Sequence, residues 1–341
     1  MENQRPLHVG IVGATGVVGK EFLILLEKRA FPIASLRLFG SARSAGKRVR
    51  WSGGGINNEI TVEDLAQADP TGLDLALFSA GKGVSLEHAP RFAAAGVVVV
   101  DNSSAFRRDP AIPLVVPEVN PGDLATTRSR IIANPNCSTI ILLMALAPIH
   151  RALDVVDCVV STYQAVSGAG KAAVDELFGQ ARAFAAGDEP RCEAFDRPIF
   201  LNVLPQIGPW QANGDSEEEA KFTQESRKIL GDNTFRCHAT CVRVPVERCH
   251  SESVYVRLGR ATSEQEILAL LRAAPGVALD DLATPRELAN REEVFVSRVR
   301  VDEEDPRVLR FWVVSDQLWK GAALNSIQIA EAMGALGRFD Q

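Results

Sequence analysis

Cys137 is the residue of this sequence whose surroundings most favour covalent chemistry. It stands in NPNCST, residues 134–139, after two turn-forming asparagines and before the apolar run IILLMALAPI. At the start of a helix, unpaired backbone N–H groups and the helix dipole favour a thiolate. A buried cysteine is more often a small apolar side chain, so this local context alone leaves packing open as the alternative.

A cysteine nucleophile works with a base, and His250 in RVPVERCHSESV is the best candidate among the five histidines. His8 lies in or beside a predicted strand, and His88 and His150 lie on predicted helices. His238 shares a predicted strand with apolar neighbours. We expect these four histidines to be structural.

Three of the six cysteines cluster in RCHATCVRVPVERCH, which raises the question of zinc. Cys237, Cys241 and Cys249 are separated by three and seven residues, form no CxxC pair, and begin in an alternating, strand-like pattern. We therefore expect no metal site. The N-terminal MENQRPLHVG is charged where a signal peptide would be apolar, so we expect reduced thiols and a cytoplasmic protein.

Composition points to a globular protein that binds small molecules. The chain has 341 residues, 46% of them hydrophobic, enough for two domains. Its net charge is -6, with 37 basic and 43 acidic residues dispersed along the chain, which gives no footprint for nucleic acid or an anionic membrane. No apolar run approaches the roughly 20 residues that span a bilayer.

The N-terminal elements that must position these residues have the rhythm of a Rossmann domain. LHVGIV predicts a buried strand, GATGVVG a glycine turn and EFLILLEKR a helix. Further strands are predicted at SLRLFG, DLALFSA and GVVVVD, with a helix around LEHAPRFAAAG. This order is typical of a doubly wound parallel sheet, which we expect over residues 1–133.

The glycine turn predicts a dinucleotide site. Gly13, Gly16 and Gly19 are spaced so that the backbone can approach a pyrophosphate at a helix N-terminus. An NAD site expects an acid after the second strand, whereas this chain has SARSAGKR with Arg43, which favours the 2'-phosphate of NADP. A thiolate together with NADP can oxidise an aldehyde through a thioester intermediate.

The second domain, expected over residues 134–317, has longer and consecutive strands. They are predicted at VVDCVVSTYQ, RCHATCVRVPV, SVYVRLGR, VFVSRVRV and VLRFWVVS, which favours an α+β domain with a mixed sheet. Helices are predicted at AGKAAVDELFGQARAFAAG, EEEAKFTQESRKIL and SEQEILALLRAA, the last opened by a capping box from Ser263 to Glu266. A C-terminal helix in 318–341 is expected to complete the first domain.

Seven segments in one order carry a resemblance to a known family: GATGVVG, SARSAGK, DNSSAFR, NPNCST, YQAVSGAG, RVPVERCHSE and KGAALNSIQIAE. Together they resemble aspartate-β-semialdehyde dehydrogenase over nearly the whole chain. The resemblance implies reversible conversion of L-aspartyl-4-phosphate and NADPH into aspartate semialdehyde, NADP and phosphate. It also implies a place in lysine, methionine, threonine and isoleucine synthesis, and a catalytic domain that forms a homodimer; a tetramer stays open.

The resemblance implies roles for the motif residues. Cys137 would form the acyl-enzyme with Asn136 shaping the site, Gln164 would orient the thioester, and His250 would act as acid and base. Arg243 would bind the substrate α-carboxylate as a two-pronged ion pair. The remaining substrate contacts implied are the α-ammonium at Glu218, with Glu217 and Glu219 as alternatives, and the phosphate at Lys221 and Arg107, with Arg108 as the alternative to the latter.

The resemblance also implies the cofactor contacts. Those at the pyrophosphate turn are Thr15, Gly16, Val17 and Val18. Those near the 2'-phosphate are Ser41, Arg43 and Ser44. Those near nicotinamide are Ser167, Gly168 and Asn325.

Two segments depart from the expected family pattern, since CHSE stands for GHSE and SDQLWKGAA stands for SDNL before KGAA. Neither removes a catalytic group. The competing hypotheses are N-acetylglutamyl-phosphate reductase, a malonyl-CoA reductase of the same superfamily, and a non-catalytic NADP-binding relative. The joint presence of Cys137, Gln164, Arg243 and His250 argues against the last.

Overall fold

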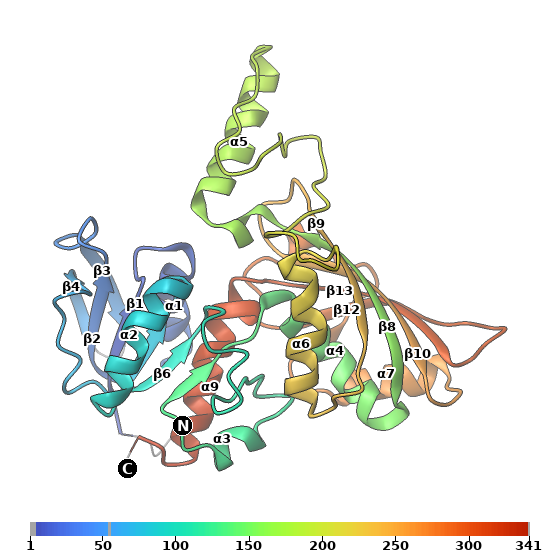
Figure 1. The fold of residues 1–341 in the computed structure, drawn as a ribbon, viewed down its shortest axis with the longest axis horizontal. Helices are drawn as coiled ribbons and strands as arrows, with labels where there is room; N and C mark the ends of the chain where they lie inside the picture. The colour runs from blue at the N-terminus through green and yellow to red at the C-terminus, as the bar shows by residue number, and fades with distance from the viewer. Residues whose placement is uncertain (1–4, 54–55, 340–341) are drawn as a thin grey trace. The chain divides into compact units, whose positions relative to one another are not determined.

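The computed structural model describes residues 5–53 and 56–339, which form two compact units (Figure 1). One unit comprises Met1–Asn136 with Ala322–Gln341, and the other comprises Cys137–Gly321. The first four and last two residues of the expected N-terminal domain lie outside the described residues.

The first unit is built on a seven-stranded sheet with the order β3-β4-β2-β1-β5-β6-β7. All its neighbouring strands run parallel except β3 and β4, which pair antiparallel at one edge. The strands are β1 (Leu7–Val12), β2 (Ile33–Gly40), β3 (Arg48–Gly53), β4 (Ile56–Asp64), β5 (Leu75–Phe78), β6 (Val98–Asp101) and β7 (Ile131–Ala133). The predicted parallel sheet is therefore confirmed, with an antiparallel edge that was not predicted.

The helices of this unit are α1 (Val17–Lys28), α2 (Lys82–Ala94), α3 (Gly122–Thr126) and α9 (Leu324–Ala335). The C-terminal α9 packs against α1, and Arg29 donates to Glu331 across the two helices at 2.7 Å. Apolar residues of β1 and α1, among them Val9, Ile11 and Phe22, are fully buried between the layers.

The second unit is built on a six-stranded mixed sheet with the order β11-β12-β13-β10-β8-β9. Two pairs, β8 with β9 and β11 with β12, are parallel, and the others are antiparallel. The strands are β8 (Val155–Gln164), β9 (Cys237–Arg243), β10 (His250–Leu258), β11 (Val277–Leu279), β12 (Val294–Val301) and β13 (Val308–Ser315). A mixed sheet was predicted, and β8, β12 and β13 have the predicted bounds.

The helical segments of this unit are α4 (Cys137–Leu153), the 3-10 turn η1 (Val166–Ala169), α5 (Lys171–Ala186), α6 (Glu217–Leu230), α7 (Glu264–Ala273), α8 (Pro285–Leu288) and the π-helical η2 (Trp319–Ala323). Helix α4 contacts β8, β10, β12 and β13 as well as α6 and α7. This central place explains its apolar run, because a helix surrounded by sheet and helices has no face left for polar residues.

Helix caps differ in part from the expectation. At α7 only half of the predicted capping box forms: the Glu266 N–H donates to Ser263 Oγ at 3.2 Å, but the Glu266 carboxylate binds Arg260. A complete capping box opens α6 instead, between Ser216 and Glu219. The arginine at residue 260 therefore competes for the carboxylate that the box requires.

Helix α5 and the segment that returns from it, residues 187–200, project from the sheet of the second unit as an arm (Figure 1). A side chain of α5 holds the returning segment against the helix, since Gln180 Oε1 accepts from the Ile199 and Phe200 N–H groups. Among the described residues, no helix has both the length and the apolar character needed to cross a bilayer.

Candidate active site

Cys137 is the first residue of α4, so its side chain stands at the helix N-terminus as predicted. The backbone of η2 comes close to it. A Cβ on Gly321 would lie 2.8 Å from the Cys137 Cβ, a distance that carbon atoms do not tolerate. Glycine at residue 321 therefore allows a close approach to the sulfur-bearing residue, in a π-helical turn of the kind that often marks functional sites.

Gln164, Arg243 and His250 come together at one edge of the sheet. Gln164 and Arg243 are the last residues of the parallel strands β8 and β9 and are register partners. His250 is the first residue of β10, which runs antiparallel to β8, so its start lies beside the end of β8. All three side chains are buried. Three predicted site residues from distant parts of the sequence thus meet.

Arg243 is held by the backbone of the turn that follows β8. Its Nη1 donates to the Ala165 carbonyl oxygen at 2.7 Å. Burial lowers the pKa of Arg243, while the negative charges of Glu218 and of the Cys137 thiolate oppose that shift. A buried guanidinium that interacts with both groups places positive charge where an anionic substrate and a thiolate are expected.

The His250 imidazole is oriented through Ala165, whose carbonyl oxygen also accepts from Arg243. Its Nδ1 lies 3.1 Å from the Ala165 nitrogen and accepts that N–H, which assigns the proton of the neutral ring to Nε2. Burial, followed by the charge of Arg243, lowers the pKa of His250 to about 3. Nε2 is buried and has no hydrogen-bond partner among the described residues. It is the ring nitrogen left to act on another molecule.

Gly168 lies against both Arg243 and His250. A Cβ at this residue would come within 3.0 Å of Arg243 Nη1 and within 3.2 Å of His250 Nε2. Its neighbour Ser167 is buried, donates from Oγ to the Glu247 carbonyl oxygen and accepts from Gln317. The η1 turn is thereby fixed beside the imidazole.

Helix α6 brings Glu218 to this group. Its Oε1 accepts from Gln164 Nε2 at 3.3 Å, and its Oε2 accepts from Lys221 Nζ at 3.0 Å. The Glu219 carboxylate is used by the capping box and by the Cys241 N–H, and the Glu217 side chain is 41% exposed. Of the three adjacent glutamates, Glu218 is the one that faces Gln164.

Arg107 lies in the first unit and is buried. Its Nε donates to the Asn134 carbonyl oxygen at 2.9 Å and its Nη2 to that of Asn102 at 2.8 Å. Asn134 also accepts from Asn325 Nδ2 at 2.7 Å, and that amide donates to Val115 as well. The Nδ2 group of Asn325 is thus engaged within the first unit. Asn136, also buried, is the last residue of the first unit before the helix of Cys137.

The glycine turn after β1 has the geometry of a dinucleotide site. Gly13 has φ +86°, and a Cβ on it would lie 2.3 Å from the Ser79 carbonyl oxygen, so only glycine fits. A Cβ on Gly19 would lie 2.2 Å from the Gly13 carbonyl oxygen, so α1 packs directly on the turn. Gly16 caps α1, which starts with Val17 and Val18 and points its N-terminus toward the turn's open side.

The loop after β2 lies next to this turn. Thr15 Oγ1 and Ser44 Oγ are 3.3 Å apart, and the Ser41 carbonyl oxygen accepts from the Ser44 N–H. Arg43 is exposed, and within the described residues its guanidinium makes no hydrogen bond or ion pair. These residues fit a nucleotide with an extra phosphate, since a solvated guanidinium can turn toward it.

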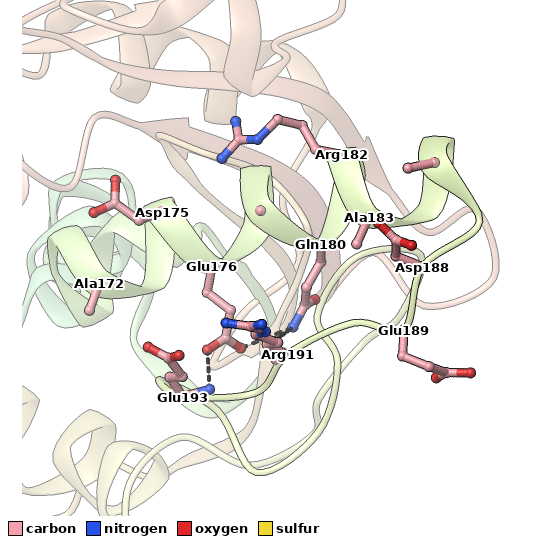
Figure 2. A pocket seen from close by; sticks show the side chains of 12 residues that line it. Ala172, Asp175, Glu176, Gln180, Arg182, Ala183, Asp188, Glu189, Arg191 and Glu193 are labelled. Atoms are coloured by element: carbon pink, nitrogen blue, oxygen red, sulfur yellow. Dashed lines mark hydrogen bonds between the residues drawn. The ribbon is translucent and has the colours of Figure 1, made fainter.

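Other candidate sites carry no such chemistry. Among the described residues, no group of three or more His, Cys, Asp or Glu could hold a metal ion. Cys249 packs in an apolar cluster with Ala283, Leu288, Phe295 and Val314, and burial raises the pKa of its thiol. A hollow of about 870 Å³ on the α5 arm is lined by Glu176, Gln180 and Arg191 among others, and none of the predicted site residues lines it (Figure 2).

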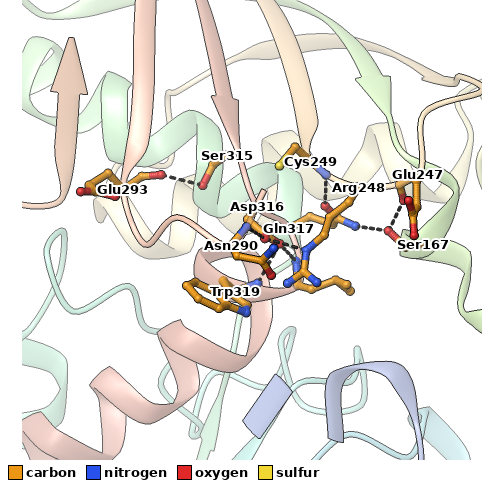
Figure 3. A network of polar contacts seen from close by, with 11 residues as sticks. Ser167, Glu247, Arg248, Cys249, Asn290, Glu293, Ser315, Asp316, Gln317 and Trp319 are labelled. Carbon is orange, nitrogen blue, oxygen red and sulfur yellow. Dashed lines mark hydrogen bonds and ion pairs between the residues drawn. The ribbon is translucent and has the colours of Figure 1, made fainter. Parts of the chain in front are cut away.

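Sequence reasoning missed the segment after β13. Asp316 and Gln317 are buried and bind the two residues that precede His250 and a residue of η1 (Figure 3). The only signal was SDQ directly after a strand that ends in an apolar run, and it was interpreted as a departure from a family pattern rather than as part of the site.

Two family models match the chain, "semialdehyde dehydrogenase, NAD binding domain" over residues 8–127 and "semialdehyde dehydrogenase, dimerisation domain" over residues 146–320. The aspartate-semialdehyde dehydrogenase of Aquifex aeolicus is 46% identical over 335 residues, 96% of this chain and 97% of that protein. The chain belongs to the aspartate-semialdehyde dehydrogenase family. The member from Bacillus subtilis is 45% identical, with 97% of this chain and 99% of that protein covered.

Solved structures of aspartate-semialdehyde dehydrogenases share the fold. That of Vibrio cholerae aspartate semialdehyde dehydrogenase II, complexed with ASA, has a TM-score of 0.93 and 42% identity over 96% of this chain and 98% of that one. The Candida albicans aspartate semialdehyde dehydrogenase, solved with NADP, has a TM-score of 0.76 and 26% identity. The resemblance and the fold class predicted from the sequence are confirmed, and residues 8–127 form a nicotinamide-dinucleotide domain of this family.

Proposed function

We propose that this chain catalyses the NADPH-dependent reduction of L-aspartyl-4-phosphate to L-aspartate 4-semialdehyde through an acyl-thioester on Cys137. The observation that carries the proposal is the buried group formed by Gln164, Arg243, His250 and Glu218, whose charges interact with one another and with Cys137. Such a group offers a nucleophile, a proton donor and opposite charges for a zwitterionic acyl phosphate.

Cys137 opens the reaction. Its thiolate attacks the acyl carbon, a C–S bond forms, the C–O bond to phosphate breaks, and the phosphate leaves with the electron pair. Lys221 is the cation of the second unit that receives the leaving phosphate, and for Arg107 of the first unit we propose the same ligand. Developing negative charge is stabilised where fixed cations face it.

The acyl-thioester is held and reduced beside His250. Gln164 orients the thioester through its amide, and bound NADPH supplies the hydride. The Nε2–H of His250 then donates a hydrogen bond to the oxygen of the tetrahedral hemithioacetal as that oxygen gains charge. Collapse returns the electron pair to the Cys137 sulfur and releases the aldehyde. In the reverse direction the same Nε2–H, kept by the bond from the Ala165 N–H to Nδ1, donates to the oxygen as the Cys137 thiolate adds to the aldehyde.

The amino-acid part of the substrate is recognised by charge. Arg243 binds the α-carboxylate with its guanidinium fork, and Glu218 binds the α-ammonium. Glu218 is supported by its contacts with Gln164 and Lys221, which place it on the side of the thioester-orienting residue. Asn136 shapes the approach to Cys137 from the preceding residue.

We propose NADP as the cofactor and assign its contacts residue by residue. The pyrophosphate binds at Gly13, Thr15, Gly16, Val17 and Val18, where the strain-free glycine turn meets the start of α1. The 2'-phosphate binds at Ser41, Arg43 and Ser44. The nicotinamide binds near Ser167, Gly168 and Asn325. The NADP in the Candida albicans relative supports this choice.

We further propose a homodimer, formed through the unit that matches the dimerisation domain, and a cytoplasmic location. The match over residues 146–320 supports the first. The six cysteines, all described, form no disulfide, which is typical of a reducing compartment and supports the second.

The deciding test follows absorbance at the reduced-nicotinamide band while the purified protein is mixed with aspartate semialdehyde, phosphate and NADP. Parallel reactions contain NAD in place of NADP or omit phosphate. We expect phosphate-dependent formation of NADPH. A folded, NADP-binding protein that gives no signal would instead favour another acyl donor, which N-acetylglutamate semialdehyde and malonate semialdehyde with coenzyme A would identify.

A further inference from the structure

The carboxylate of Asp316 is the centre of a buried polar network at the end of β13 (Figure 3). It is 0% exposed. Its Oδ2 accepts from Arg248 Nε at 2.7 Å and from the Asn290 N–H at 2.8 Å. Its Oδ1 accepts from the N–H groups of Leu318 and Trp319 at 3.0 and 3.2 Å. One carboxylate thus joins the segment before β10, the segment before β12 and the start of η2.

Gln317, the next residue, holds two further pieces of the same region. Its Oε1 accepts from the Cys249 N–H at 2.8 Å, and its Nε2 donates to Ser167 Oγ at 2.6 Å. Ser167 Oγ in turn donates to the Glu247 carbonyl oxygen. The turn that leads into His250 and the η1 turn are therefore tied to one short segment.

The residues so fixed directly flank the groups of the active site. Arg248 and Cys249 immediately precede His250, and Ser167 precedes Gly168, which lies against Nε2 of that histidine. On the other side, the Gly321 N–H donates to the Asp316 carbonyl oxygen at 3.2 Å, and Gly321 approaches Cys137. Through these contacts, the segment of Asp316 and Gln317 is tied both to the residues that precede His250 and to the glycine that approaches Cys137.

The turn before His250 needs external support. Cys249 has φ +71°, a left-handed conformation that costs a non-glycine residue about 1 kcal/mol or more. A strained backbone keeps its conformation only where surrounding contacts determine it. Here those contacts are the side chains of Asp316, which accepts from Arg248, and of Gln317, which accepts from the Cys249 N–H.

We propose that Asp316 is a positioning residue of the reaction, which fixes the orientation of His250 through Arg248 and through the segment that carries Gln317. This inference rests on the proposed function, and it adds a residue that does not touch the substrate. A purely structural role as the cap of η2 would use only Oδ1, whereas the positioning role depends on the bond from Arg248 to Oδ2.

The Asp316→Asn variant separates these two roles. The asparagine oxygen can still accept from Leu318 and Trp319, but its amide nitrogen cannot accept from Arg248 or Asn290. We expect kcat to fall by about 10- to 100-fold, as for a misplaced catalytic group, with the KM for substrate and the affinity for NADP within about threefold. Unchanged kcat in the folded variant would overturn the proposal, and so would a loss confined to KM.

Asp305→Asn is the matched control. Asp305 also accepts from two arginines and from a backbone N–H, but it lies on an exposed turn between β12 and β13. We expect its kcat to stay at the wild-type level. An equal loss of kcat in both variants would contradict a specific role for Asp316.

Arg248→Gln covers the case in which Asp316→Asn does not fold, and the double variant tests the coupling where it does. Arg248→Gln leaves the buried carboxylate with its three backbone donors, and we expect the same selective fall in kcat. In the double variant Arg248→Gln with Asp316→Asn, the asparagine amide nitrogen that replaces Oδ2 can donate to the glutamine oxygen, so we expect kcat to recover at least severalfold over Arg248→Gln. A double variant no better than the single one would count against coupling through this contact.

A readout independent of turnover distinguishes failure of this inference from failure of the proposed function. In protein labelled with ¹⁵N-histidine, nitrogen shifts report which ring nitrogen of His250 carries the proton, with His250→Gln used to assign the signal. We expect one Nε2–H tautomer in the wild type and a tautomer mixture in Asp316→Asn. A single unchanged signal in the variant would refute the positioning role, even if the protein used another substrate.

Discussion

Gly168 lies directly against His250, because a methyl group at residue 168 would sit 3.1 Å from Cε1 and 3.2 Å from Nε2 of the imidazole. The same methyl group would sit 3.0 Å from Arg243 Nη1. The backbone of η1 therefore packs directly against the side chains of the proposed base, His250, and of the proposed carboxylate-binding residue, Arg243.

Substitution of Gly168 by alanine should impair catalysis without unfolding the protein. The added methyl group must displace the imidazole or the guanidinium by a few tenths of an ångström, and we expect kcat/KM to fall at least tenfold, about 1.4 kcal/mol. Steady-state kinetics measure this. The control is Gly179→Ala inside α5, where a Cβ meets nothing within 4 Å and activity should be retained.

Replacement of Cys137 by alanine should abolish phosphate-dependent reduction of NADP, since no thioester can form. Binding of NADP, measured by fluorescence titration, should be unchanged. The same substitution at the exposed Cys192 should leave activity intact. Turnover that persists in Cys137→Ala would overturn the assignment of the nucleophile.

The Arg243→Lys variant should mainly weaken substrate binding. An ammonium group supplies a point charge but not the guanidinium fork, so we expect KM for aspartate semialdehyde to rise about tenfold or more, with a smaller change in kcat. Arg257→Lys on β10 of the same sheet, where the arginine pairs with Asp305 at the surface, is the control. Equal KM values in the two variants would remove Arg243 from the substrate site.

The backbone at Cys249 predicts an unusual order of stabilities. Glycine relieves the left-handed strain, whereas alanine keeps it and also loses the packing of the sulfur. We therefore expect Cys249→Gly to be more stable to urea than Cys249→Ala by about 1 kcal/mol. At Cys241, inside β9, the order should be reversed, because glycine weakens a strand. The same order at both residues would disprove strain at Cys249.

Burial of His250 makes stability depend on pH. Its pKa is lowered to about 3 in the folded chain, against about 6.5 when unfolded, so the unfolded state binds more protons between these values. Stability is therefore lost as pH falls from about 6.5 toward 3, by roughly 2 kcal/mol between pH 7 and pH 5. The loss over that interval should be smaller by this amount in His250→Gln, measured by urea unfolding. Parallel pH profiles of the two proteins would contradict a neutral, buried imidazole.

The sequence allowed the elements to be predicted wherever one local signal was strong. Alternating apolar residues set the bounds of β8, and unbroken apolar runs marked β5 and β6. The hairpin of β3 and β4 was missed because RVRWSG is largely polar and exposed, with the buried Trp51 as its main apolar contact. At the start of α7, Arg260, which precedes the helix, binds the Glu266 carboxylate that the sequence pattern assigns to a capping box with Ser263.

The sequence predicted several residues that the structure brings together, but not their contacts. Cys137 was singled out by its place before an apolar helix, a local property. The pairing of Gln164 with Arg243 joins residues 79 positions apart, and nothing in either strand fixes that register. The choice of Glu218 among three glutamates required the capping box, which turns Glu219 away. Asp316 was missed because its partners lie in three separate segments.

The strand order of the second unit determines when, during synthesis on the ribosome, the active site can form. His250 begins β10, which lies between β8, synthesised long before it, and β13, synthesised some 60 residues later. A nascent chain released before residue 308 would already contain Cys137, Gln164, Arg243 and His250, yet one flank of β10 would be open and the segment of Asp316 absent. Catalytic competence should therefore arise late and abruptly during synthesis, so that incomplete chains contain Cys137 but lack enzymatic activity.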